Sequence, residues 1–235
     1  MQYLPGKKII LSLAFGLGIA TSLIGQQVKT RENLNYLDFQ NKRFYFGMAI
    51  GINSGKFIVN QSKNLIGNPS INTVESESKN GFNVHMITNM KMGENFDFRV
   101  NPGFSFNYRS LTFNNEKDRT IESVFFEVPI SIRFKSAPYK DKRAFVSAGI
   151  KYGYDVSSNS RTRRTENVLK VAPHDFQWEV GVGMQFFNPF FIFSPELKIS
   201  RAINNSLIFN GALEESNVIQ SMNSQFITLT FNFEG

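Results

Sequence analysis

The sequence of 235 residues has no cysteine and only two histidines, His85 and His174. The lack of cysteine excludes disulfides, thiolate nucleophiles and cysteine-based zinc sites, and two histidines argue against a multi-histidine metal centre. Charged residues make up only 19% of the chain and 25 residues are phenylalanine, a composition that argues against disorder. The formal charge of +7 comes from basic residues that are scattered rather than clustered, which argues against nucleic-acid binding. We therefore expect no cofactor, no metal, no nucleic-acid partner and no small-molecule substrate.

The sequence also lacks an apolar run long enough for a membrane-spanning helix, which needs about 20 residues. The nearest candidate, residues 9–24, is diluted by glycine, follows Lys7 and Lys8, and ends at Gly25 before polar residues. These features predict a secretory signal peptide over residues 1–25, with a transmembrane anchor as the alternative. Removal of this segment takes away two lysines and no acid, so the charge falls from +7 to +5. Because no cysteine follows the run, the mature chain is not expected to be a lipoprotein.

The rest of the chain is dominated by a period of two. Residues 26–42 are polar without a clear period, and we interpret them as an N-terminal periplasmic lead. From residue 43 onward, apolar and polar residues alternate as they do in a strand with one apolar and one polar face. Eight runs follow this pattern: 44–53, 82–90, 96–108, 124–134, 146–155, 176–186, 191–200 and 227–233.

The spacers between these runs alternate in length. Short spacers follow the second, fourth and sixth runs, and long ones follow the first, third, fifth and seventh: 54–80, 110–121, 156–174 and 204–223. Short turns at one end and long loops at the other are typical of an outer-membrane barrel, whose short turns are periplasmic. An even number of strands then places both termini in the periplasm. The sequence predicts an all-β fold: an eight-stranded antiparallel, up-and-down, OmpA-like transmembrane β-barrel over residues 43–235, located in the cell outer membrane.

Alternation alone does not say which face points outward, because a soluble lipocalin-like barrel alternates as well, with its apolar side around a ligand. The polar face decides between the two. It mixes charges of both signs with seven glycines: Gly47, Gly51, Gly103, Gly149, Gly153, Gly181 and Gly183. Glycine weakens a water-facing strand, but small residues beside long charged ones suit a narrow, crowded interior. We therefore expect the apolar face, which is aromatic at many run ends, to contact lipid.

The polar face carries four acids and four bases. We predict that they form a charge network in the lumen: Asp97, Arg99, Glu127, Arg133, Lys151, Glu179, Glu196 and Lys198. Buried charges need partners, and three of these residues lie at similar distances from the periplasmic ends of their runs. We therefore predict a Lys151–Glu179–Lys198 cluster, with Glu196 as a further member. Since eight strands leave a lumen that side chains fill, we expect a plugged barrel that does not conduct solutes.

Residues that could indicate an enzyme have simpler interpretations. Gly181-Val182-Gly183 lies within a strand and no helix follows it, unlike a phosphate-binding loop. His85 has no serine near it in sequence, and a satisfied lumen histidine is the simpler hypothesis. His174 and Asp175 have no nucleophile elbow to serve. We expect no catalytic residue and no enzymatic activity.

Two further charged groups remain. Asp155 and Glu179 are a pair of carboxylates without a shaped cleft, which favours salt bridges over glycosidase-like chemistry. Four basic residues make the third long loop a candidate surface contact: Arg161, Arg163, Arg164 and Lys170. This loop is either merely solvated, or it contacts acidic lipopolysaccharide headgroups or an acidic partner.

Four segments carry a family resemblance: Ile121-Glu122-Ser123 with Phe126-Glu127-Val128-Pro129 and Arg133-Phe134-Lys135-Ser136; Asp175-Phe176-Gln177-Trp178-Glu179-Val180-Gly181-Val182-Gly183; Pro189-Phe190-Phe191-Ile192-Phe193-Ser194-Pro195-Glu196-Leu197-Lys198-Ile199-Ser200 with Asn204-Asn205; and Phe231-Asn232-Phe233-Glu234. Together they make the chain, from about residue 44 to its end, resemble PorT-family outer-membrane barrels from the Bacteroidetes. Members of that family are components of the type IX secretion system, which exports proteins across the outer membrane and in gliding species supports the delivery of surface adhesins.

The resemblance implies a structural role in type IX secretion, and in gliding motility where that occurs, through contacts with other components of the system. The family has no defined catalytic motif, so the resemblance transfers no active site. Outer-membrane lipid and lipopolysaccharide are the other expected partners. An outer-membrane enzyme, a small pore and an adhesion barrel are the alternatives.

Overall fold

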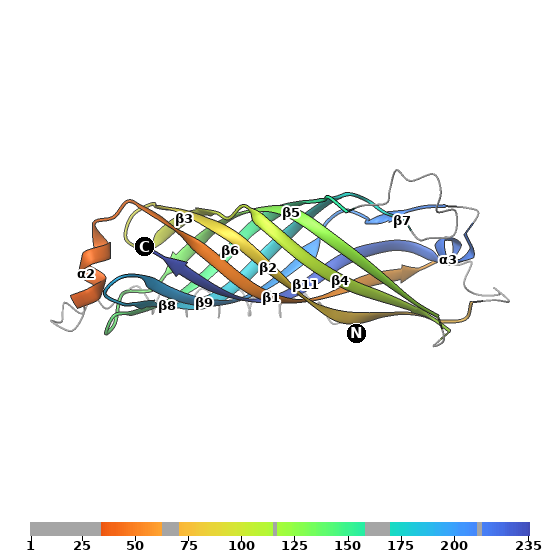
Figure 1. Ribbon diagram of the computed structural model, residues 1–235, viewed down its shortest axis with the longest axis horizontal. Helices are drawn as coiled ribbons and strands as arrows, with labels where there is room; N and C mark the ends of the chain where they lie inside the picture. The colour runs from red at the N-terminus through yellow and green to blue at the C-terminus, as the bar shows by residue number, and fades with distance from the viewer. Residues whose placement is uncertain (1–33, 63–70, 115–116, 158–169, 211–212) are drawn as a thin grey trace, which may run out of the picture.

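The chain folds into a closed antiparallel barrel, described by a computed structural model for residues 34–62, 71–114, 117–157, 170–210 and 213–235 (Figure 1). The strands in order around the ring are β1 (Phe44–Gln61), β11 (Ile219–Glu234), β9 (Ile192–Ala202), β8 (His174–Phe187), β6 (Lys142–Asp155), β5 (Lys117–Lys135), β3 (Phe96–Val100) with β4 (Gly103–Phe113), and β2 (Val74–Lys91). The ring closes because β1 also pairs with β2. All pairings within the ring are antiparallel, and each joins walls that follow one another in sequence or, for β1 with β11, the first wall with the last. This confirms the predicted up-and-down fold.

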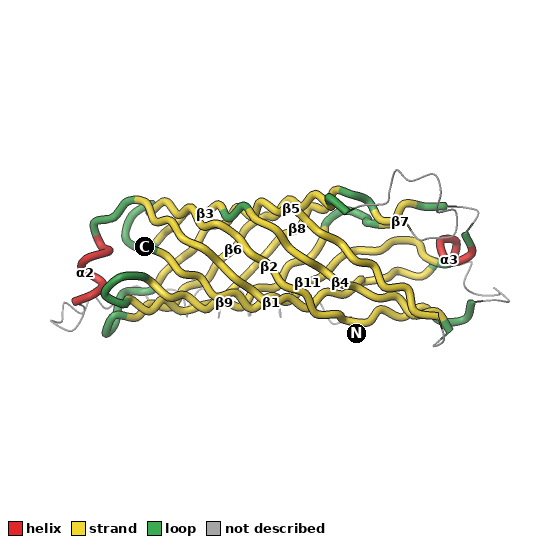
Figure 2. Tube along the Cα trace, viewed as in Figure 1, coloured by secondary structure: helices red, strands yellow, loops and turns green. Residues whose placement is uncertain are grey.

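The strands β3 and β4 occupy one position in the ring, so the barrel has eight walls. They are separated by Asn101 and Pro102, and proline has no N–H to continue the ladder. The neighbouring strands still bond to this break: Asn101 N donates to Pro129 O at 3.0 Å, and Met86 N donates to Pro102 O at 2.8 Å. The tilted strands are followed most easily in the trace of Figure 2.

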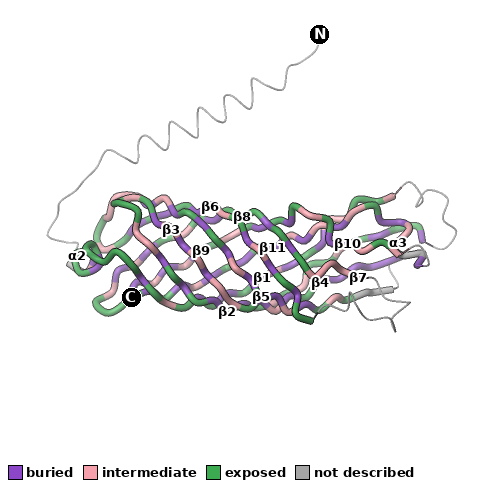
Figure 3. Tube along the Cα trace, turned by 90° about the horizontal axis from the view of Figure 1, so that it is seen from above, coloured by how far each residue is buried: buried purple, intermediate pink, exposed green. Residues whose placement is uncertain are grey.

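The barrel wall is apolar outside and polar inside over most of its length. On β1, Ile50 and Ile52 are exposed on the outer face, whereas Asn53 is buried inside. On β8, Val180 and Val182 are exposed and Glu179 is buried. This alternation of exposed and buried residues along each strand is visible in Figure 3. An exposed apolar band around a polar interior is the arrangement of a lipid-embedded barrel and the reverse of a lipocalin-like one.

One end of the barrel extends beyond this band, and there the polarity is reversed. On β1, the inward residue Phe57 is buried while the outward Lys56 is exposed. The inward apolar residues of this extension form a core: Phe57, Ile71, Val74, Leu111, Phe113, Leu207, Val218, Ile219 and Met222. We call this core the outer plug, because it closes the interior at the long-loop end.

Two of the long loops expected from the sequence are largely strands in the structure. The spacers 54–80 and 110–121 were expected as loops, but β1 continues to Gln61, β2 begins at Val74, β4 continues to Phe113 and β5 begins at Lys117. These residues fold as strands because their apolar members lie at inward positions and pack into the outer plug. The other two spacers carry the short strands β7 (Lys170–Val171) and β10 (Leu207–Ile208), which pair with each other, and the helix α3 (Glu214–Asn217).

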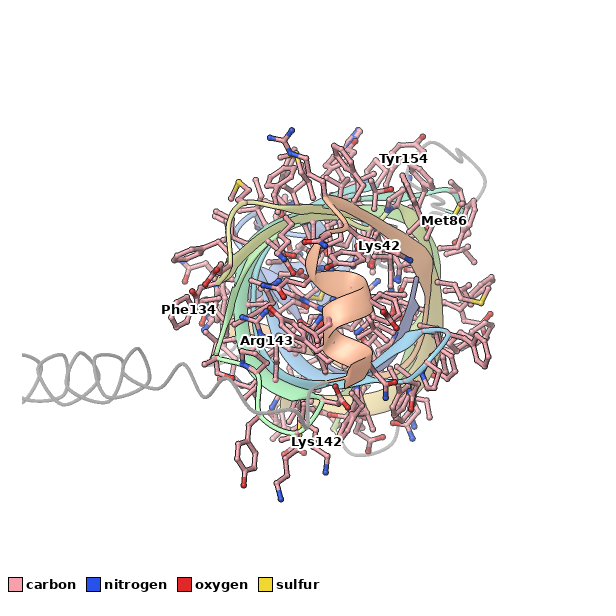
Figure 4. All side chains as sticks on the ribbon, turned by 90° about the vertical axis from the view of Figure 1, so that its left-hand side faces the viewer. Lys42, Met86, Phe134, Lys142, Arg143 and Tyr154 are labelled. Carbon is pink, nitrogen blue, oxygen red and sulfur yellow. The ribbon has the colours of Figure 1, made fainter. Side chains whose placement is uncertain are left out.

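The opposite end is covered by the helix α2 (Leu34–Gln40), within the segment expected only as a polar lead. Tyr36 and Phe39 of this helix are buried against Tyr45, Phe187 and Ile192. Figure 4 shows the helix lying across the mouth of the barrel. In the described part of the chain, no helix has both the length and the apolarity needed to cross a membrane.

The two environments of the wall predict opposite responses to a new charge. Val180→Arg places a guanidinium in the middle of the apolar band and should lower the free energy of unfolding by about 2–4 kcal/mol. Asn60→Arg places the same group on the exposed face of the extension and should change it by less than about 0.5 kcal/mol. Denaturant unfolding in lipid vesicles, followed by the fluorescence of the single tryptophan, measures both. Equal losses in the two variants would contradict the lipid-facing assignment.

Candidate functional site

Two arginines and two glutamates from four strands meet in the lumen near its short-turn end. Arg99 of β3 donates to Glu234 of β11, with 2.6 Å between Nη2 and Oε2. Arg133 of β5 binds Glu196 of β9 at 2.5 Å and also reaches Glu234 at 3.3 Å. Each of the four side chains is at most 5% exposed. Because β5 and β9 are not neighbours in the ring, this group, which we call the four-charge network, bridges the lumen.

The four-charge network is held by neutral neighbours as well. Ser147 Oγ donates to Glu196 Oε1 at 2.7 Å, and Arg99 Nε donates to Asn89 Oδ1 at 3.1 Å. The guanidinium of Arg133 lies 4.0 Å from the centre of the Phe145 ring, a favourable cation–π distance. These contacts fix the side chains in a narrow space where buried charges are tolerated only when they are paired.

Below this network, towards the short-turn end, the lumen is closed by a second layer of charge. Lys135 Nζ lies 2.6 Å from Asp97 Oδ1, and both side chains are buried. Arg143 donates to the carbonyl oxygens of Ser136 and Glu94 at 2.7 and 2.9 Å. Figure 4 shows Arg143 beside the helix that covers this end.

The helix α2 is attached to the barrel at both of its ends. At its start, Asn35 Nδ2 donates to Phe187 O, and Tyr36 N donates to Asp141 Oδ1 at 3.0 Å. At its end, Lys91 Nζ donates to Gln40 O at 2.6 Å. The attachment points lie on different strands and turns, so the helix acts as a strap across the mouth.

The aromatic residues of the strap connect it to the charges beneath. Arg143 Nη1 donates to the Tyr36 hydroxyl at 3.3 Å, and Tyr45 donates to Phe39 O at 2.7 Å. Burial raises the pKa of the Tyr36 phenol, and the opposing effect of the nearby Arg143 charge is smaller. The phenol therefore stays neutral and can accept this hydrogen bond at physiological pH.

The middle of the lumen holds two lysine–glutamate pairs. Lys151 Nζ lies 3.1 Å from Glu127 Oε1, and the Nε2 atom of His85 lies 3.5 Å from the other oxygen of the same carboxylate. Lys198 Nζ lies 3.8 Å from Glu179 Oε1. His85 is therefore a buried lumen histidine beside a carboxylate, and no hydrogen bond joins its ring to a serine in the described part of the chain.

The predicted Lys151–Glu179–Lys198 cluster is wrong in one partner. Lys198 does pair with Glu179, but Lys151 pairs with Glu127 and not with Glu179 in the described structure. Both lysines lie on strands that run from the short-turn end to the long-loop end. Each pairs with a glutamate on the strand that precedes it in the chain, and this glutamate lies two residues nearer the long-loop end than the residue directly opposite the lysine. In a twisted sheet the two diagonals between neighbouring strands are not equivalent, and height along a strand alone does not select between them. Glu196, expected as a further member, belongs to the four-charge network instead.

Towards the long-loop end, Arg109 of β4 marks the boundary between the polar lumen and the outer plug. Its Nη1 and Nη2 atoms donate to the hydroxyls of Ser224 and Ser123 at 2.6 and 2.7 Å. Its guanidinium lies within 6 Å of three ring centres: Phe57, Phe125 and Phe226. Among the described residues no carboxylate forms an ion pair with it, so hydroxyls and aromatic faces accommodate this buried charge.

Glycines make room for these side chains. A Cβ atom on Gly181 would lie 2.7 Å from Ser147 Oγ and 2.8 Å from Lys198 Cγ, and one on Gly183 would collide with the Phe145 ring. Gly181-Val182-Gly183 is thus an interior segment of β8 that lets lumen side chains approach the wall, and not a phosphate-binding loop.

The other expected enzymatic residues are separated. His174 and Asp175 are adjacent in a strand, so they point to opposite faces: His174 is exposed, with Nδ1 2.9 Å from the Tyr152 hydroxyl, while Asp175 is buried and accepts from Gln177. Asp155 accepts hydrogen bonds from Ser157, far from the ion pair of Glu179. These side chains do not converge on a common centre.

The basic third loop is only partly described. Arg161, Arg163 and Arg164 lie outside the described residues. Lys170 is half-buried in β7, opposite Ile208 of β10. Its role as a surface contact therefore stays a prediction.

Several lumen residues were not expected from the sequence, above all Glu234, Lys135, Arg143 and Arg109. Each lies one or more residues beyond the end of a predicted run, at a position that continues the alternation on the polar face of that run. Extending each run until that alternation failed would have found them. The strap gave a weaker signal, because residues 26–42 contain only five apolar residues: Val28, Leu34, Tyr36, Leu37 and Phe39.

Comparisons with known proteins agree with this geometry. The model of a protein family described as outer membrane protein beta-barrel domain matches residues 26–207. No curated protein matches the chain. Among solved structures, the outer membrane protein OprG from Pseudomonas aeruginosa is similar with a TM-score of 0.51 and 7% identity, over 82% of this chain and 95% of that one. Neisserial surface protein A has a TM-score of 0.44 and 10% identity, over 81% and 96%. The likeness to OprG concerns the fold alone.

The four-charge network predicts a large effect of removing one carboxylate. Glu234→Gln leaves Arg99 and Arg133 with one acid between them and should lower the free energy of unfolding by about 3 kcal/mol or more. Glu77→Gln, which breaks the exposed pair with Lys79, should cost less than about 1 kcal/mol. Denaturant titration of both variants in lipid vesicles gives the comparison. If the two variants unfold at the same denaturant concentration, the network does not stabilise the barrel.

Proposed function

We propose a function for this chain on the premise that it belongs to the family of outer membrane protein beta-barrel domains. It is an outer-membrane barrel that serves type IX protein secretion as a structural component, acting through contacts with other proteins of that machinery and not as an enzyme or a channel. In a gliding species the same role would extend to the delivery of surface adhesins.

The observation that carries this proposal is the filled lumen. Side chains cross the interior at successive levels, from the strap and the Asp97–Lys135 pair, through the four-charge network, to Arg109 and the outer plug. Such an interior favours a role at the outer surface and the two ends over passage of solutes.

The resemblance to the PorT family supports the choice of machinery. Its segments contribute the walls that carry Glu127, Arg133, Glu179 and Glu196, and the ending that carries Glu234. The resembling residues thus include some of the charges that fill the lumen as well as lipid-facing positions between them.

Deletion of the gene tests the role in secretion. We expect type IX cargo proteins to accumulate in the periplasm, and the wild-type gene to restore their export. Val180→Arg, which weakens the barrel, should restore export less well, whereas the matched Asn60→Arg should restore it fully. Normal export in the deletion strain would contradict the proposal.

A small pore is the competing function, and it makes a separate measurement decisive. The purified barrel in planar lipid bilayers should show no single-channel conductance, because its lumen is filled. Steady conductance from the wild-type protein would favour the pore and remove the basis for the structural role.

We also place both termini in the periplasm, which is supported by the short turns and the strap at one end and the extended strands at the other. The cysteine-free chain allows a direct test. Lys79→Cys, on the exposed extension, should react with a membrane-impermeant maleimide in intact cells, and Phe190→Cys, in an exposed short turn, should react only after the outer membrane is broken. The opposite pattern would reverse the orientation.

A further inference from the structure

Three polar side chains lie side by side on the outer wall, on consecutive strands. Lys56 of β1 is paired with Gln225 of β11, which is paired with Arg201 of β9. Directly opposed residues in a sheet point to the same face, and the spacing of two strands puts the Lys56 and Arg201 backbones roughly 10 Å apart. Lys56 and Arg201 are exposed and Gln225 is half-buried. We call these three residues the wall triad.

The wall triad lies where the outer face changes from apolar to polar. On the side of the apolar band, the same strands expose Ile52, which is 59% accessible, together with Ile227 and Ile199. On the other side, Asn60 donates a hydrogen bond to Ser221 at 2.8 Å across the exposed extension. The triad therefore lies at the level of lipid headgroups when the apolar band is embedded in the bilayer.

The two cations of the triad are uncommitted. In the described part of the chain, neither Lys56 nor Arg201 forms an ion pair or a side-chain hydrogen bond, in contrast to Lys79, which pairs with Glu77. Inside the barrel, the cation at the boundary with the outer plug, Arg109, is engaged by two hydroxyls and by aromatic rings. Two unpaired cations next to an apolar surface can attract an anionic group such as a lipid phosphate.

We propose that the wall triad binds the phosphate group of a phosphorylated glycolipid in the outer leaflet of the membrane. The Arg201 guanidinium offers a planar fork to two phosphate oxygens, the Lys56 ammonium offers a mobile point charge, and the Gln225 amide offers a neutral donor between them. Their long aliphatic stems lie over the apolar wall while the charged ends reach the headgroup layer.

The surroundings favour a lipid over a free anion. Trp178 is paired with Arg201 on the next strand, and Ile203, which is 67% accessible, follows Arg201 on β9. A tryptophan and exposed isoleucines beside two cations provide an apolar surface for acyl chains and an attachment for the phosphate. A free phosphate ion would use only the second of these.

The choice of the outer leaflet depends on the proposed orientation of the barrel, but binding itself is measured on purified protein, where orientation plays no part. The full chain in detergent is titrated with diphosphorylated lipid A, dephosphorylated lipid A, phosphatidylglycerol and inorganic phosphate, and bound lipid is counted by native mass spectrometry. The test variant is Lys56→Gln/Arg201→Gln. The matched control is Lys42→Gln/Arg43→Gln, which removes the same two residue types from exposed positions at the opposite rim.

We expect diphosphorylated lipid A to bind the parent and the control alike, and to bind the test variant roughly fivefold more weakly or worse, because two charge contacts are lost. Dephosphorylated lipid A should bind all three proteins as weakly as the test variant binds lipid A. Heat-modifiable migration on gels verifies that each variant is folded.

Four outcomes would overturn the site. Equal binding of lipid A by the parent and the test variant would show that the triad does not bind it. An equal loss of binding in the control would show that only general charge attraction is involved. Displacement of lipid A by inorganic phosphate at the same concentration would indicate a free-anion site, and an equal preference for phosphatidylglycerol would remove the outer-leaflet glycolipid as the ligand.

Discussion

The bilayer interior offers the backbone no hydrogen-bond partners, and this constraint governs the structure. An open sheet would leave two unpaired edges in lipid, so β1 must pair with both β11 and β2, and the sheet must close. Closure with eight walls leaves an interior only as wide as the side chains that fill it. The lipid outside requires apolar residues at every other position, which directs the polar residues into that narrow interior. The buried charges, and their need for partners such as Arg133 with Glu196 across the lumen, follow from this sequence of requirements.

The same strands continue past the lipid, and the residues at inward and outward positions then exchange their character. On β1 the outward series runs from Ile50 and Ile52 to Lys56, while the inward series runs from Asn53 to Phe57. The backbone pattern is unchanged across this transition, so the surrounding solvent alone decides which face is apolar. One end of the molecule is therefore built like a membrane barrel and the other like a soluble one. The outer plug is the ordinary hydrophobic core that water imposes on the second part.

The membrane part could be predicted because its alternation is regular, and each of the eight runs coincides with a wall of the ring, apart from the break at Asn101 and Pro102 and from Phe191, which precedes β9. The extensions are not evident from the sequence because their apolar residues occupy inward positions, whereas those of the membrane part occupy outward positions. The eight predicted lumen charges face the interior. Their partners, however, depend on diagonal contacts between neighbouring strands and on contacts across the ring, and the alternation of apolar and polar residues does not specify either. Lys151 illustrates the first case, and the Arg133–Glu196 pair the second. Glu234 was missed because its run was ended one residue early, although it holds two arginines together.

Because the interior is filled, the function of the barrel depends on its outer surface and on how the barrel is held in the membrane. Its apolar band is uneven: on β1 it stops at Ile52, whereas on β9 it continues to Ile203, past Arg201. Hydrophobic matching to such a border sets the average depth of the barrel but constrains its tilt only weakly. A phosphate held by the wall triad would add a polar attachment at one point on the circumference, and would thereby fix depth and tilt together. The extension above that point would then present its strands and loops to a partner in one orientation, which is what the proposed role through protein contacts requires.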